Sequence, residues 1–60
     1  MNPGIVPGAV VCHPGEPDWG RGQVQTVVGS RVTVNFEDAG KRVIDASVVR
    51  LEVVAPERDF

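Results

Sequence analysis

The placing of valine constrains the fold of this chain more than any other feature. Thirteen of the sixty residues are valine, and they occur in short stretches separated by glycine, proline and polar residues. Valine is stiff at χ1 and favours strands over helices. In residues 31–36 apolar and polar side chains alternate without a break, which predicts a strand with one buried face. The sequence therefore predicts an all-β fold.

Five short strands are expected, joined by tight turns. They span residues 9–13, 22–28, 31–36, 41–45 and 51–54. Gly29 and Ser30 turn the second strand into the third, and the turn over residues 37–40 makes Gly40 the residue expected to take a positive φ. Asp45 is expected to cap a single 3₁₀ turn before the last strand. This pattern predicts a small five-stranded SH3-like (Tudor-like) barrel.

The register between the second and third strands follows from the apolar pattern. A two-residue turn pairs Val28 with Arg31, and it then places Gln25 opposite Val34, on the apolar face. A three-residue loop instead pairs Val28 with Val32 and keeps the apolar side chains together. We therefore expect a three-residue loop or a compensating bulge.

A chain of this length allows one domain with a small core. We expect residues 8–54 to form the barrel, with residues 1–7 as a flexible N-terminal tail and residues 55–60 as a flexible C-terminal tail. Ile5 and Val6 are apolar, so they can dock on the barrel edge. We expect Cys12 to lie in the core, because a lone free cysteine is usually buried.

The same sequence suggests a cytoplasmic protein. It lacks the long apolar run of a transmembrane helix and the charged and apolar regions of a secretory signal. A single cysteine is typical of a reducing compartment. We therefore expect a cytoplasmic protein that does not bind a membrane.

One stretch, HPGEPDWGRGQV over residues 13–24, holds the only histidine and the only tryptophan. Gly20 and Gly22 are expected where a Cβ would clash or where φ is positive. Trp19 has two interpretations that do not exclude each other. Its ring can cover the mouth of the barrel, or it can anchor an interface together with Arg21, because Trp and Arg are enriched among residues that dominate binding energy.

Catalysis and metal binding are not predicted. Cys12 and His13 are neighbours on a strand and point to opposite faces, and the sequence contains no further His or Cys. No nucleophile and base accompany His13. Gly20 and Gly22 lack the third glycine and the following helix of a dinucleotide site. We therefore expect no enzyme activity, no metal, no cofactor and no small-molecule substrate.

The formal net charge of −2 lacks the basic excess that is typical of nucleic-acid-binding domains. A local basic strip is still an alternative site. Its members would be Arg21, Arg31, Lys41 and Arg42, which would contact phosphates.

The pattern of glycine, His-Pro, aromatic and apolar residues resembles a known domain. The matching residues are Gly8, Val10 or Val11, His13, Pro14, Trp19, Gly20, Gly22, Val24, Val32, Val34, Phe36, Gly40, Lys41 or Arg42, and Val43. They are similar to the C-terminal Tudor/SH3-like domain of UvrD/PcrA-type repair helicases. The segments HPGEPDWGRGQV and VNFEDAGK also resemble a family of short bacterial proteins with the motif HPGxPDWGxGQV.

In those helicases the domain is understood to dock on RNA polymerase, and CarD-like proteins use a related barrel in the same way. The resemblance therefore implies a non-catalytic module that binds RNA polymerase or another transcription or repair protein. The residues expected to contact this partner are His13, Pro14, Trp19, Gly20 and Arg21. A partner strand can also add to an open sheet edge, and a third hypothesis is a structural subunit that is stable only as an oligomer.

Overall fold

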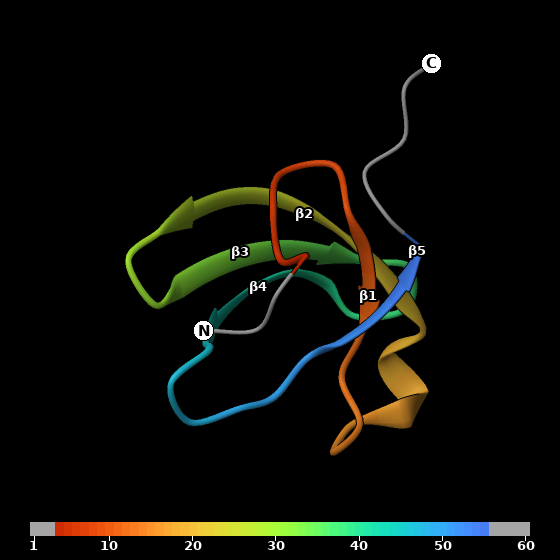
Figure 1. Ribbon diagram of the computed structural model, residues 1–60. Helices are drawn as coiled ribbons and strands as arrows, with labels where there is room; N and C mark the ends of the chain where they lie inside the picture. Colours follow the sequence, from red (N-terminus) through yellow and green to blue (C-terminus); the bar gives the residue numbers. More distant parts are fainter. Residues whose placement is uncertain (1–3, 56–60) are drawn as a thin grey trace.

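The computed structural model describes residues 4–55, and the parts of the expected tails at residues 1–3 and 56–60 lie outside the described residues. Five strands form one antiparallel sheet in the order β4-β3-β2-β1-β5 (Figure 1). They are β1 (Val10–Cys12), β2 (Arg21–Val28), β3 (Arg31–Phe36), β4 (Gly40–Asp45) and β5 (Glu52–Ala55). The all-β prediction is confirmed, and every strand begins and ends within one residue of its expected bounds.

The sheet is curved, and the first and last strands are neighbours within it. β1 pairs with both β2 and β5. Figure 1 shows the short strands β1 and β5 crossing the curved ribbon of β2, β3 and β4 at a steep angle. β4 and β5 form the two edges, and over residues 4–55 no ladder joins one edge to the other. The sheet therefore wraps around a core without closing.

The 3₁₀ turn lies in a different place from the one predicted. The described residues contain one 3₁₀ helix, η1 (Pro17–Trp19), between β1 and β2. Pro17 favours this conformation because its ring fixes φ in the helical range. After β4, the Asp45 carboxylate instead accepts the amide of Ser47, and the Asp45 carbonyl accepts the amides of Val48 and Val49. Asp45 therefore caps a turn at the expected place, but the turn mixes one i→i+3 bond with one i→i+4 bond and is not a 3₁₀ helix.

The β2–β3 hairpin has a two-residue turn, so the three-residue loop is wrong and the compensating bulge is confirmed. Val28 pairs with Arg31, and the register shifts between Val24 and Thr26. Gly29 has a φ of 59°, which suits the first position of a type II′ turn.

The bulge restores the apolar pairing that the short turn would otherwise destroy. Gln25 is the extra residue, so Val24 lies opposite Val34 and Gly22 opposite Phe36. Without that extra residue in the strand, every side chain before it would point to the opposite face. Burial of the apolar face therefore selects the bulge.

The core is one apolar cluster on the inner face of the sheet. Among the described residues its buried members are Ile5, Ala9, Val11, Val24, Val32, Val34, Phe36, Ile44 and Leu51. Ile5, in the segment expected to be a tail, is only 3% exposed. The expectation that Cys12 lies in the core is wrong. Its side chain is half-buried, because Val11 occupies the inner face of β1 and Cys12 points to the other face.

Candidate functional site

Trp19 lies at the centre of a group of packed side chains. Its ring makes edge-to-face contacts with His13, at 5.0 Å between ring centroids, and with Phe36, at 5.2 Å. The guanidinium carbon of Arg42 lies 5.0 Å from the centroid of the Trp19 ring, within the range of a cation–π contact. We call His13, Trp19, Phe36 and Arg42 the Trp19 cluster. Phe36 is buried and Trp19 is half-buried, so the cluster connects the core to the surface.

Backbone hydrogen bonds hold Trp19 in this position from both sides. Its amide donates to the carbonyl of Glu16 at 3.0 Å, and its carbonyl accepts the amide of Asp38, also at 3.0 Å. The second bond ties the loop to the β3–β4 turn. Gly20 then has a φ of 75° and a ψ of −164°, a conformation that is essentially restricted to glycine. Of the two reasons expected for a glycine at residue 20, a Cβ clash or a positive φ, the positive φ is confirmed.

His13 fixes the beginning of the same loop. Its Nδ1 accepts the amide of Gly15 at 3.1 Å, and its carbonyl accepts the amide of Glu16 at 3.0 Å. The imidazole is therefore held between this tight turn and the ring of Trp19. Pro14, within the turn, is exposed. These contacts give His13 a structural role in the loop and leave Pro14 accessible to a partner.

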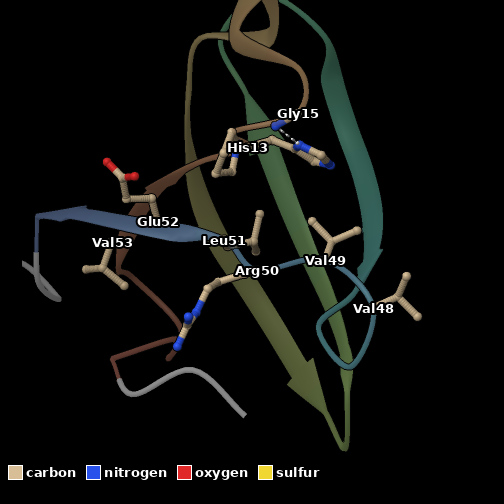
Figure 2. Close-up of a pocket in the computed structure, with 9 residues that line it drawn as sticks. His13, Gly15, Val48, Val49, Arg50, Leu51, Glu52 and Val53 are labelled. Carbon is tan, nitrogen blue, oxygen red and sulfur yellow. Dashed lines mark hydrogen bonds between the residues drawn. The ribbon is translucent and has the colours of Figure 1, made fainter.

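A shallow groove borders the cluster on the side of His13. Its lining comes from residues 13–15 on one side and residues 48–53 on the other, and its volume is about 710 Å³. Figure 2 shows His13 and Gly15 above the segment that carries Val49, Leu51 and Val53. Leu51 is buried, whereas Val48 is 80% exposed. We call this surface the valine groove, and His13 belongs both to it and to the Trp19 cluster.

Charged side chains flank these apolar surfaces. Arg21 follows the loop, and its Nε lies 3.7 Å from Oε1 of Glu37. Both side chains are about two-thirds exposed, at 66% and 64%. At the valine groove, Arg50 and Glu52 stand on either side of Leu51. The exposed ion pair of Arg21 and Glu37 adds little stability. Together with Arg50 and Glu52, it leaves both signs of charge available around the apolar surface.

The four cations of the alternative basic strip do not share one face. Arg42 lies over the Trp19 ring, whereas Lys41, its neighbour in β4, points to the opposite face. Arg31 lies at the far end of β3, opposite Asp45, and Arg21 is paired with Glu37. The structure therefore joins only Arg42 directly to the tryptophan.

Two kinds of feature are absent from the described part of the chain. Within residues 4–55, no three side chains of His, Cys, Asp or Glu stand close enough together to hold a metal ion. In the same range, no helix is long and apolar enough to cross a membrane. The compartment stays a prediction.

Sequence reasoning missed two contributors to this site. The sequence pattern names Phe36 only as a motif residue and Arg42 as a motif residue or a member of the basic strip, yet both contact Trp19. It also missed the valine groove, although Val48 and Val49 in a turn are unusual enough to signal exposed apolar surface. Gly22 was recognised correctly: a Cβ there would lie 2.7 Å from Cδ1 of Phe36.

Comparison with known proteins gives one match. Residues 5–54 match the model of a family described as "Protein of unknown function (DUF3553)". The match runs from Ile5 in the core to Val54 in β5, so it includes the Trp19 cluster and the valine groove. Neither a curated protein nor a solved structure matches the chain.

Proposed function

The chain belongs to the DUF3553 family, and we propose that this member is a small SH3-like (Tudor-like) module that docks on a protein partner. The barrel description is supported by the pairing of the first strand with the last and by the wrapping of the sheet around one core. The docking surface is the Trp19 cluster together with the valine groove. RNA polymerase, or another transcription or repair protein, is the first partner to test, because the motif residues resemble the helicase and CarD-like domains.

The observation that carries the proposal is the half-buried Trp19 ring, which makes edge-to-face contacts with His13 and Phe36 and has Arg42 over its face. A surface tryptophan with a fixed orientation loses little conformational freedom on binding. Large aromatic side chains of this kind supply much of the binding energy at protein interfaces. The ring is therefore prepared to bury its remaining exposed area against a partner.

The valine groove supplies a second contact beside the ring. Val48 exposes most of its side chain and Val53 exposes 36%, so an apolar partner side chain in the groove would remove this area from water. Arg21 and Glu37 directly follow Gly20 and Phe36 in the chain and form an exposed ion pair beside the loop, where charges mainly steer and orient a partner. Together these features fit an extended partner segment with an apolar side chain and charged neighbours.

Binding to purified RNA polymerase tests the proposal, after nuclease treatment of both proteins. We expect Trp19→Ala to lower the affinity at least tenfold, which corresponds to about 1.4 kcal/mol. Because Trp19 also packs against Phe36, two milder variants accompany it: Arg21→Ala beside the loop and Val48→Ser in the groove. Their matched controls are Arg31→Ala and Val28→Ser, which change exposed residues of the same type away from the site.

The outcomes separate the proposal from the nucleic-acid alternative. Docking predicts that the site variants weaken binding while the controls do not, and that the affinity changes little with salt. In a parallel titration with a DNA duplex in place of polymerase, binding to phosphates predicts that Arg21→Ala and Arg31→Ala weaken binding alike and that the affinity falls steeply with salt. Failure to bind polymerase, with capture of a different protein that depends on Trp19, would reject the partner but keep the docking surface.

A further inference from the structure

The open edge of the sheet at β4 has features that suit a second copy of this chain. β4 runs for six residues and pairs with β3 along its whole length. Among the described residues no strand pairs with its other side. An open edge of this length can pair with another strand, and because Lys41 and Asp45 are charges of the kind that deter such pairing, the partner strand must match them.

One hydrogen bond shows which residues of β4 face the open edge. The amide of Ala46 donates to the carbonyl of Ser30 at 2.7 Å, so the pair Arg31 and Asp45 between them is a non-hydrogen-bonded pair of the antiparallel ladder. By the alternation of such ladders, residues 40, 42 and 44 use their backbone groups to bind β3. The amides of Lys41, Val43 and Asp45 therefore point away from the sheet.

The same three residues also share the outer face, because Ile44 between them points into the core. Val43 is 61% exposed. It lines a shallow hollow with Val28, which is 73% exposed. The open edge of β4 therefore offers unpaired backbone groups to a partner, and its outer face offers apolar surface.

Charge favours one register among the antiparallel β4 pairings whose two-fold axis lies at an outward-facing residue. A centre at Lys41 would oppose two lysines, and a centre at Asp45 would oppose two aspartates, which is unfavourable. A centre at Val43 brings Lys41 of each copy opposite Asp45 of the other. Asp45 is suited to this role because hydrogen bonds from Ser47 lower the pKa of its carboxyl, which keeps it charged.

We propose that two copies of this chain associate by antiparallel pairing of their β4 edges, with Val43 opposite Val43 at the two-fold axis. Each Val43 amide then donates to the Val43 carbonyl of the other copy, and each Asp45 amide donates to the opposite Lys41 carbonyl. The Asp45 carbonyl is already bound to the amides of Val48 and Val49. The proposal rests on the edge alone and is independent of the docking surface.

This interface is small, so the dimer is expected to be weak. Interfaces that bury less than ~1,200 Å² form mostly transient complexes. The dimer would present two Trp19 clusters at once, which increases the apparent affinity for any partner with two matching sites. Because the dimer is weak, the fraction of chains in the dimer, and with it this increase in apparent affinity, should rise with the concentration of the chain.

Sedimentation equilibrium of the whole chain over a wide concentration range tests the proposal. We expect a reversible monomer–dimer equilibrium. Val43→Pro should shift it to monomer, because proline removes the outward-pointing amide while the hydrogen bonds to β3 remain. Proline cannot serve as a control inside the sheet, because it would remove a hydrogen bond between strands. The control is Gln23→Ala, on the exposed outer face of β2, which should leave dimerisation unchanged. Trp19 fluorescence reports whether each variant keeps its fold.

A charge exchange tests the register itself. Lys41→Glu opposes acidic residues across the axis, and Asp45→Lys opposes basic residues, so each variant alone should be monomeric. An equimolar mixture restores both opposite-charge pairs and should form a heterodimer. A monomer at every concentration would overturn the proposal, and so would species larger than a dimer, because pairing of β4 with β5 of another copy continues without closing. Mixed variants that stay monomeric while the wild type dimerises would reject this register.

Discussion

Gly22 in β2 lies directly opposite Phe36 in β3, and the Phe36 ring occupies the space that a side chain at residue 22 would need. A Cβ on residue 22 would lie 2.5 Å from Cγ1 of Val34 and 2.7 Å from Cδ1 of Phe36. Both neighbours are buried, so neither can move away freely. The missing side chain at residue 22 therefore lets Phe36 reach the ring of Trp19.

Gly22→Ala should destabilise the fold by about 1–3 kcal/mol, because overpacking forces buried side chains from their preferred positions. Urea denaturation followed by Trp19 fluorescence measures the change. Gln23→Ala, an exposed change at the next residue, should alter stability by no more than ~0.5 kcal/mol. Equal effects of the two substitutions would show that the contact with Phe36 is not tight.

Trp19→Ala should lower stability by about 1–3 kcal/mol, since the half-buried ring makes two aromatic contacts. Arg42→Ala removes only the cation–π contact, and we expect a loss of about 0.5–1 kcal/mol. Thermal melting by circular dichroism gives both values. If Arg42→Ala has no larger effect than Arg31→Ala, the guanidinium does not stabilise the ring.

Stability should fall in acid partly through Asp45. The hydroxyl of Ser47, and then its amide, hold the pKa of this carboxyl below its usual value. A carboxyl with a lowered pKa in the folded state stabilises the fold above its unfolded pKa of ~3.9, and this contribution is lost as the pH falls through the folded value. Denaturation across this pH range should show a weaker pH dependence in Asp45→Asn than in the wild type. Parallel curves of the free energy of unfolding against pH for the two proteins would contradict the assignment. The pH dependence of Ser47→Ala should lie between those of Asp45→Asn and the wild type.

Cys12 should react with a thiol reagent in the native protein. Its side chain is half-buried on the outer face of β1, so a reagent can reach it without unfolding. A matched control places the only thiol one residue earlier, as Val11→Cys combined with Cys12→Ser, at a position that is fully buried. Stopped-flow labelling should be fast for the wild type and limited by unfolding for the control. Equal rates would place both thiols in the same environment.

Local features of the sequence determined the strands, most turns and the special glycines. The alternation in residues 31–36 has a period of two, which is a property of the strand itself, and β3 occupies these residues. Gly40 has a φ of 74°, as its place in the turn predicted. These features depend on the conformation of a few consecutive residues, so the sequence alone could specify them.

The tertiary structure decided which faces and which distant segments meet. Alternation separates Val11 from Cys12 but does not say which of two apolar side chains faces the core, because that depends on how the sheet curves. The bulge at Gln25 depends on burial across two strands. Arg42 reaches Trp19 only through pairing of β4 with β3. The valine groove likewise joins residues 13–15 to residues 48–53, because the energy of such contacts depends on the folded sheet rather than on local conformation.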